Sequence, residues 1–398
     1  MTQDSREVEL DVLRIAHGGV AVAELDGRVV FVADTLPGER VLARITDDRH
    51  ERFWRAETVR VLDASADRVP HVWQAASIER APEHRAGGAE FGHIAPERQR
   101  TLKEEVLRDA LVRTGRLAQD EIDRLDPRVG AVPGEPDGTR SRTRVRLHVD
   151  RTGRVGPYAA RSKRVVPVPD LPLAVEPIER LLPGRATGRE LDLVASGSGA
   201  FASGPRERRD PVVERVGDRA FRIEALGFWQ VHPAAPAALT AAVRAAVDPG
   251  LLDPDADNLD LYGGVGLLTA ALADERDVRV TTVESDAAAS GHAAHNLADL
   301  PRARAVAARV DAFLAGGAAR PGATVVLDPP RSGAGAEVVR GIVAAGPAQI
   351  VYVACDPVAL ARDVAILAEH GWGLDRLDAF DLFPNTHHLE AVARLTPR

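Results

Sequence analysis

Four apolar stretches that alternate with alanine-rich stretches constrain most strongly what the second half of this chain can fold into. The apolar stretches span residues 258–262, 279–284, 323–328 and 349–355. Short apolar strands separated by helical segments are typical of an open, doubly wound parallel sheet with helices on both faces. Such a sheet binds its ligands beyond the carboxyl ends of its strands. The residues that follow each predicted strand are therefore the first candidates for a functional site.

The first predicted strand runs into a glycine-rich turn with the sequence Asp260-Leu261-Tyr262-Gly263-Gly264-Val265-Gly266. Glycines let the backbone turn sharply and approach a ligand closely. The next predicted strand ends at Glu284, whose carboxylate can accept hydrogen bonds from both hydroxyls of a ribose. This combination fits enzymes that use NAD and enzymes that use S-adenosylmethionine (SAM) alike.

The third predicted strand ends in Asp328-Pro329-Pro330-Arg331. The two prolines predict a rigid loop with few backbone donors, so that polar groups face a ligand in a set geometry. Asp-Pro-Pro at a strand end is typical of methyltransferases that act on planar nitrogen or carbon acceptors. The motif therefore favours SAM over a nicotinamide cofactor.

The chain's single cysteine, Cys355, follows the fourth predicted strand and precedes a predicted helix. The partial positive charge of a helix N-terminus predicts a lowered thiol pKa and a reactive thiolate. A small buried hydrophobe is the commoner role of a lone cysteine, but the position at the ligand edge favours a nucleophile. Near the C-terminus, Glu390 opens an apolar run that we predict to be an edge strand. It is either a general base or a surface glutamate.

Taken together, four motifs in this order resemble those of the RNA 5-methyluridine methyltransferase family. They are Phe228-Trp229-Gln230, Asp328-Pro329-Pro330-Arg331, Cys355-Asp356-Pro357 followed by Leu360-Ala361-Arg362-Asp363, and the stretch from Phe383 to Glu390. The resemblance implies a class I SAM-dependent methyltransferase of Rossmann-like α/β fold. It also implies that the thiolate of Cys355 adds to carbon 6 of a uracil and that Glu390 then removes the proton from carbon 5.

The resemblance further implies the residues that bind cofactor and substrate. The SAM site would include Gln230, Tyr262, Gly264, Gly266, Glu284, Asp311 and Asp328. Phe228 would stack on the target base, and Arg331 would also contact the substrate.

Residues 7–63 contain five short β-branched runs separated by turn signals such as Gly18-Gly19 and Pro37-Gly38. This pattern predicts a small closed five-stranded barrel of the OB type, and the segment resembles the TRAM domain, an RNA-binding barrel. We expect three domains: the barrel at 1–66, a small central α+β region with an RNA-binding subdomain at 67–215, and the catalytic domain at 216–398.

The central region contains the most basic stretch of the chain. Arg140, Arg142, Arg144 and Arg146 alternate with uncharged residues, so a strand would place their four guanidinium groups on one face, where they could follow RNA phosphates. A solvated face of an antiparallel sheet explains the same pattern, and the residues alone favour it.

Members of the family often carry a four-cysteine iron–sulfur cluster between the barrel and the catalytic domain. The matching stretch here, from Ala81 to His93, and the fourth position at Leu171 contain no cysteine. We therefore expect neither an iron–sulfur cluster nor another metal.

The net charge of −8 argues against a nucleic-acid binder, but charge that is segregated along a chain makes this a poor guide. We expect a monomeric cytoplasmic enzyme without a membrane segment that methylates a uridine in RNA, with ribosomal RNA favoured over transfer RNA by family analogy. Two alternatives stay open: a SAM-dependent methyltransferase for a small molecule or DNA, and an RNA-binding homologue that has lost catalysis.

Overall fold

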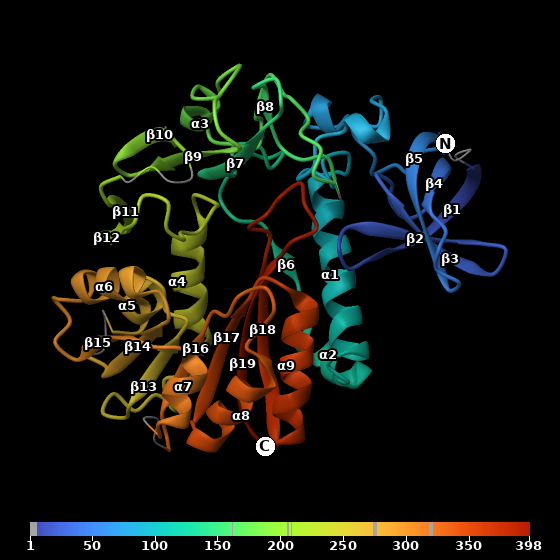
Figure 1. The fold of residues 1–398 in the computed structure, drawn as a ribbon. Coiled ribbons are helices and arrows are strands. Elements are labelled where there is room, and N and C mark those ends of the chain that lie inside the picture. The colour runs from blue at the N-terminus through green and yellow to red at the C-terminus, as the bar shows by residue number, and fades with distance from the viewer. Residues whose placement is uncertain (1–5, 161, 205–206, 208, 274–276, 318–320) are drawn as a thin grey trace.

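The computed structural model describes residues 6–398 except 161, 205–206, 208, 274–276 and 318–320. The chain forms three parts: a barrel, a mainly antiparallel central part and a large sheet covered by helices (Figure 1). No helix of the described residues is long and apolar enough to cross a membrane.

The N-terminal barrel is closed by five strands in the order β1-β2-β3-β5-β4. Their bounds are β1 (Glu7–Ala16), β2 (Val20–Leu25), β3 (Arg28–Ala33), β4 (Arg40–Asp47) and β5 (Phe53–Asp63). Alternate side chains of these strands, such as Leu10, Val30 and Val41, fill an apolar core. The predicted five-stranded barrel is confirmed.

A long helix connects the barrel to the large sheet. In α1 (Pro96–Arg113), Leu102 packs into the barrel core, whereas Leu107 and Leu111 pack into the core of the large sheet. The shorter α2 (Gln119–Leu125) follows. One helix therefore ties two cores together, which fixes the barrel beside the catalytic part.

The central part is built around a four-stranded antiparallel sheet in the order β10-β9-β7-β8. Its strands are β7 (Arg144–Val149), β8 (Val155–Gly156), β9 (Glu190–Ser196) and β10 (Gly199–Ser203), with the short α3 (Glu176–Glu179) beside them. A separate hairpin of β11 (Val212–Val216) and β12 (Arg219–Ile223) leads to the large sheet. Two 3-10 turns, η1 (Gln74–Ala76) and η2 (Pro82–His84), precede α1.

The large sheet has eight strands in the order β15-β14-β13-β16-β17-β19-β18-β6. The parallel strands are β13 (Asn258–Leu261), β14 (Val280–Glu284), β15 (Ala303–Ala307), β16 (Thr324–Leu327) and β17 (Gln349–Ala354). Antiparallel β19 (Glu390–Pro397) and β18 (Trp372–Phe380) follow, and β6 (Val129–Gly130) completes the edge. The doubly wound, Rossmann-like sheet is confirmed.

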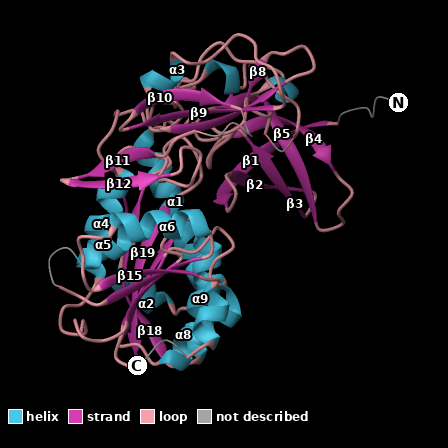
Figure 2. Cartoon of the chain, turned by 60° about the vertical axis from the view of Figure 1, so that its left-hand side comes forward, coloured by secondary structure: helices cyan, strands magenta, loops and turns pink. Residues whose placement is uncertain are grey.

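Helices cover both faces of this sheet, as Figure 2 shows. They are α4 (Ala235–Ala246), α5 (Leu267–Ala273), α6 (Ala287–Asn296), α7 (Val310–Ala315), α8 (Gly335–Ala345) and α9 (Pro357–Glu369). One apolar core joins the sheet to α1, α7, α8 and α9, and a second joins it to α4 and α5.

The prediction that the last strand lies at a sheet edge is wrong. β19 inserts between β17 and β18 and pairs with both, and Ala391, Val392 and Ala393 are fully buried. An apolar run of this kind suits a central strand, because both of its faces are covered by packed side chains.

Candidate active site

The carboxyl ends of three neighbouring strands bring the predicted motifs together. Because β16 lies between β13 and β17, Leu261, Leu327 and Tyr352 stand side by side in register. The glycine turn, the Asp-Pro-Pro-Arg loop and the cysteine follow these strands directly. The predicted convergence of motifs at one edge of the sheet is therefore what the structure shows.

The glycine turn leaves space that larger residues would fill. A Cβ atom on Gly263 would lie 1.9 Å from the hydroxyl oxygen of Thr282, whereas Gly264, with a φ of 54°, opens onto free space. The backbone N–H of Gly264 donates to the carboxylate of Glu284 at 3.2 Å. The turn is thus tightly packed against β14 at Gly263 and open at Gly264, where a ligand can approach the backbone closely.

Buried carboxyl groups line this edge. Asp260 accepts a hydrogen bond from the Thr269 hydroxyl at 2.6 Å, but its other oxygen is buried without a partner. Burial raises the pKa of Asp260 to about 7. Burial and the neighbouring Asp260 also raise the pKa of Asp328. An unpartnered buried oxygen between acids favours a ligand that brings positive charge and hydrogen-bond donors. SAM carries an ammonium group and a sulfonium group, so it fits a site that is lined by these carboxyl oxygens.

The structure contradicts the prediction of an acidic thiol. Burial, followed by the charges of Glu390 and Asp328, raises the pKa of Cys355 to about 12. The helix N-terminus gives no compensation, because the Asp356 carboxylate caps α9 and accepts hydrogen bonds from the N–H groups of Val358 and Ala359 at 3.0 and 2.8 Å. The cap supplies a negative charge where the helix alone would present a positive one.

Glu390 is not a surface residue. It is the first residue of β19 and is 3 % exposed. Ala354 pairs with Ala391 across β17 and β19, so the residues Cys355 and Glu390 sit next to each other at the sheet edge. Burial and Asp328 raise the pKa of Glu390 well above its usual value, although Arg331 opposes the shift. Burial therefore raises the pKa values of both the thiol and the carboxyl at this edge.

The remaining predicted site residues surround this centre in different ways. Burial raises the pKa of the Tyr262 phenol, and the charge of Asp311, on α7, adds to that rise. Burial raises the pKa values of both Cys355 and Glu390, and the charge of Arg331 opposes both rises, which places Arg331 near the two groups.

Phe228 and Gln230 lie on the loop between β12 and α4. The Phe228 side chain is 74 % exposed, the largest exposure among the large hydrophobic residues of the described chain. An exposed aromatic ring beside an active-site loop is available for stacking. The loop is fixed to the central sheet, since the hydroxyl and the N–H of Thr143 both donate to the carbonyl of Val231.

The arginines of the basic stretch do not form a free cationic row. Arg144 and Arg146 share β7, as predicted, but Arg140 and Arg142 precede the strand, and Arg140 pairs with Glu179. Each is bound within the protein: Arg142 donates to the carbonyl of Gly88, Arg144 to those of Ala225 and Gly227, and Arg146 to both oxygens of Asp192. Binding of RNA by these residues stays a prediction.

The region that matches the cluster segment of the family is packed with apolar side chains. Ala86, Ala89 and Leu171 are buried together with Trp73 and Leu147 in one core. No group of three or more metal-binding side chains occurs among the residues that the structure describes.

Several residues that support the site were not found from the sequence. His17, in the turn between β1 and β2, lies 2.9 Å from the Asp356 carboxylate, and this hydrogen bond raises the pKa of His17. Tyr352 donates to Asp363 at 2.7 Å, and Asp363 also accepts from the N–H of Ala334, behind the Asp-Pro-Pro-Arg loop. No local signal reveals the His17 contact, because 339 positions separate the partners.

Comparison with known proteins identifies the family. The family model for tRNA (uracil-5-)-methyltransferases matches residues 321–397. An uncharacterized RNA methyltransferase of Streptomyces coelicolor is 38 % identical over 98 % of this chain and 93 % of its own. The 23S rRNA (uracil(1939)-C(5))-methyltransferase RlmD of Halomonas elongata is 32 % identical over 97 % of this chain and 89 % of its own.

A solved structure shares the fold along almost the whole chain. The Pyrococcus abyssi tRNA (uracil-54, C5)-methyltransferase, in complex with S-adenosyl-L-homocysteine, superposes with a TM-score of 0.68 at 21 % identity, over 97 % of this chain and 99 % of that one. The four sequence motifs, the position of Asp328, Cys355 and Glu390 at one sheet edge, and the similarity to these relatives all indicate the same family. The chain belongs to the family of SAM-dependent RNA (uracil-C5-)-methyltransferases.

Proposed function

We propose that this protein methylates carbon 5 of a specific uridine in ribosomal RNA through a covalent adduct between Cys355 and carbon 6 of the base. The observation that carries the proposal is the pairing of Ala354 with Ala391, which sets the nucleophile and the base side by side. Ribosomal RNA is favoured because RlmD enzymes of this length, which act on 23S rRNA, match nearly the whole chain.

In this mechanism Cys355 must first lose its proton. SAM supplies the methyl group and, at its sulfonium, a positive charge. A positive charge near these acids would lower the raised pKa of Cys355, so that the thiol would lose its proton to the surrounding water more readily. The thiolate then bonds to carbon 6, and the electron pair of the carbon 5–carbon 6 double bond makes carbon 5 nucleophilic.

Glu390 completes the reaction as the base. Once carbon 5 carries the methyl group, its proton must leave so that the double bond can re-form and the bond from the Cys355 sulfur to carbon 6 can break. Burial and the charge of Asp328 raise the pKa of Glu390, so its ionised carboxylate holds a proton firmly once it has taken one from carbon 5. A carboxylate with a raised pKa is a stronger base.

The surrounding residues take the binding roles that the motifs imply. Glu284 accepts hydrogen bonds from the ribose of SAM beside the backbone of Gly264 and Gly266. Tyr262 and Asp311 would lie beside the adenine of SAM. Gln230 and Asp328 would make the remaining contacts to SAM. Phe228 stacks on the uracil, and Arg331 contacts the substrate.

The parts outside the large sheet serve RNA recognition. We assign residues 1–66 to a TRAM-type RNA-binding barrel, 67–215 to a central RNA-binding region without an iron–sulfur cluster, and 216–398 to the catalytic domain. The enzyme acts as a monomer in the cytoplasm, where a reducing environment keeps a nucleophilic thiol free.

The test is to map 5-methyluridine in total RNA from a strain that lacks the gene, with and without the wild-type or Cys355→Ala protein. We expect one 23S rRNA position to lose its methyl group, to regain it with the wild type and to stay unmodified with Cys355→Ala. The purified variant should still bind SAM. Unchanged RNA in the deletion strain, or methylation of DNA or a small molecule by the purified enzyme instead, would disprove the proposal.

A further inference from the structure

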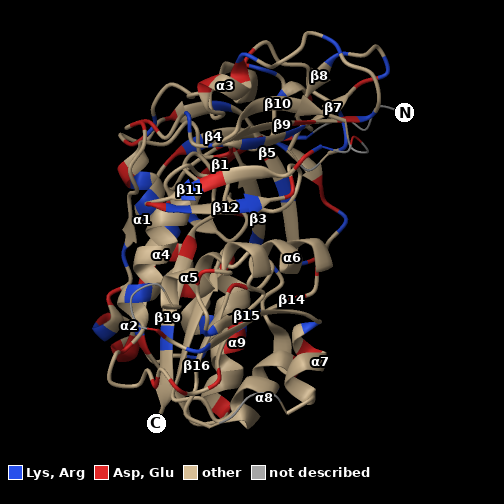
Figure 3. Cartoon of the chain, turned by 90° about the vertical axis from the view of Figure 1, so that its left-hand side faces the viewer, with Lys and Arg blue, Asp and Glu red and all other residues tan. Residues whose placement is uncertain are grey.

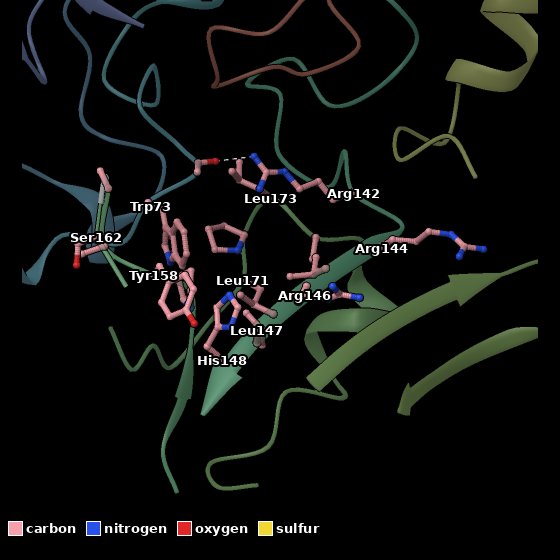
Figure 4. Close-up of a pocket in the computed structure, with 18 of the residues that line it drawn as sticks. Trp73, Arg142, Arg144, Arg146, Leu147, His148, Tyr158, Ser162, Leu171 and Leu173 are labelled. Atoms are coloured by element: carbon pink, nitrogen blue, oxygen red, sulfur yellow. Dashed lines mark hydrogen bonds between the residues drawn. The ribbon is translucent and has the colours of Figure 1, made fainter. Parts of the chain in front are cut away.

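A cavity lies in the central part, away from the sheet edge that carries Cys355. Its volume is about 810 Å³, which is within the range of ligand sites. Figure 4 shows Trp73, Tyr158 and His148 grouped together, with Leu147 and Leu171 beneath them. The cavity therefore combines an apolar floor with aromatic walls.

The aromatic walls are already ordered. The rings of His148 and Tyr158 are nearly parallel, with an interplanar angle of 8° and centroids 3.5 Å apart. The indole N–H of Trp73 donates to Asp170 at 2.7 Å, which fixes the third ring. Flat rings that are held in place can stack on a base at little further entropic cost.

The lining of the cavity is cationic although the whole chain is acidic. Arg142, Arg144, Arg146 and Lys163 are among the lining residues, and no aspartate or glutamate is among those that the structure describes. The chain as a whole carries a net charge of −8. Figure 3 also shows basic segments on the loops around β8. A ligand with negative charge fits such a lining.

Some nitrogen atoms of these lining residues lack a partner. Nε and Nη2 of Arg144 and Nδ1 of His148 are buried without a hydrogen bond, and the nearest carboxylates, on Glu214 and Glu190, are 3.9 and 3.7 Å away. The facing oxygen Oε1 of Glu214 also lacks a hydrogen bond, so Arg144 and Glu214 form a long ion pair that holds the Arg144 side chain in place.

The strand β7 connects this cavity to the active-site loop. Arg144 donates to the carbonyl of Gly227, the residue before Phe228, at 2.7 Å. His148 is four residues further along the same strand, which is about 13 Å at the usual rise of a β-strand. A single RNA strand that places a uridine beside Phe228 can therefore extend to this cavity.

We propose that the cavity binds an unpaired nucleotide of the RNA substrate, other than the target uridine. Its base stacks against the Tyr158–His148 pair, and its phosphate lies towards Lys163. That the nucleotide comes from the substrate RNA rests on the function proposed above. A free nucleotide offers the same chemistry, so the experiment must separate the two sources.

The test uses the full-length protein and a fluorescent hexa-adenylate RNA, which contains no uridine for the catalytic site. Tyr158→Leu keeps an apolar side chain but removes the stacking ring, and we expect the Kd to rise roughly 5- to 100-fold. Tyr158→Phe should bind like the wild type. Thermal melting of each variant checks that it is folded.

A matched pair of charge reversals gives a second, independent measurement. Lys163→Glu should weaken hexa-adenylate binding and reduce its salt dependence, because a phosphate contact is lost. Arg151→Glu makes the same change at an exposed position in the β7–β8 turn, outside the cavity, and should have a clearly smaller effect. Equal effects of the two reversals would show only a general charge effect and would overturn the proposal.

The third measurement tests adenosine monophosphate as a ligand that competes with hexa-adenylate. If it binds as tightly as hexa-adenylate and ribosomal RNA does not displace it, the cavity is a site for free nucleotides and the RNA proposal is wrong. Unchanged hexa-adenylate affinity in folded Tyr158→Leu would also overturn it.

Methylation assays separate this proposal from the proposed function. We expect Tyr158→Leu to raise the KM for ribosomal RNA but not that for SAM. A wild-type enzyme without activity on ribosomal RNA, but with hexa-adenylate binding that depends on Tyr158, would disprove only the catalytic proposal. Normal KM and normal binding in the variant would disprove only the cavity proposal.

Discussion

The raised thiol pKa of Cys355 leads to a measurable prediction about the resting enzyme. Burial, Glu390 and Asp328 raise this pKa from 9.0 to about 12. At pH 8 only about one thiol in 10⁴ would then be ionised, against roughly one in four for an ordinary cysteine with a pKa near 8.5. Since the thiolate is the species that reacts, alkylation should be about two thousandfold slower than that of free cysteine.

The assay is the rate of iodoacetamide alkylation between pH 7 and 10.5, followed by intact-protein mass spectrometry. The chain has a single cysteine, so every added mass reports on Cys355. The rate should still be rising at pH 10.5, because a thiol with a raised pKa ionises only at high pH. An alkylation midpoint at or below pH 9 in the ligand-free enzyme would refute the reasoning and restore the helix-terminus argument.

Two further measurements identify the cause of the shift. Glu390→Gln should lower the thiol pKa more than Asp356→Asn does, because the charge of Glu390 raises it more than that of Asp356. SAM should speed alkylation relative to S-adenosylhomocysteine, since the two cover the thiol similarly but only SAM has a sulfonium. Equal rates with the two ligands would mean that the sulfonium does not help to form the thiolate.

Three other predictions concern the base, the cofactor turn and the core. Glu390→Gln, mixed with SAM and substrate RNA, should accumulate a covalent protein–RNA species on denaturing gels that the double variant with Cys355→Ala does not form; normal turnover would place the base elsewhere. Gly263→Ala should abolish SAM binding in calorimetry, because its Cβ has no room, whereas Gly291→Ala, in open space on α6, should leave it intact. Lys103→Ala should lower the free energy of unfolding by about 3–5 kcal/mol in denaturant titrations, because it leaves a buried carboxylate without its cation.

The catalytic edge was predictable because it depends on local patterns. Apolar runs that end in Gly264, Asp328 and Cys355 place these residues at strand ends, and a parallel sheet brings its strand ends together. Two other strands of the large sheet, β15 and β18, were not predicted. β15 (Ala303–Ala307) consists of alanine, arginine and valine and is only partly buried, so it has little apolar signal. β18 (Trp372–Phe380) contains a register shift that interrupts its alternation.

The two wrong predictions have different causes. The position of β19 depends on pairing with β18, which no local pattern of its own sequence specifies. The acidity of Cys355 could have been judged better, because Asp356 followed by Pro357 is itself a sequence signal for an N-cap and the first residue of a helix. An aspartate in that place supplies the negative charge that cancels the helix terminus.

The active site also depends on chain segments that precede the catalytic domain. The loop 381–390, which leads into β19 and its first residue, is held by residues from the first third of the chain. The ammonium group of Lys103, on α1, bonds to the carboxylate of Asp381 and to the carbonyl of Phe383. The N–H of Asp381 also donates to the carbonyl of Gly130, in β6, at 2.8 Å. Since this loop positions Glu390, the proposed general base, α1 and β6 support the proposed catalytic site although a division at residue 216 assigns them elsewhere.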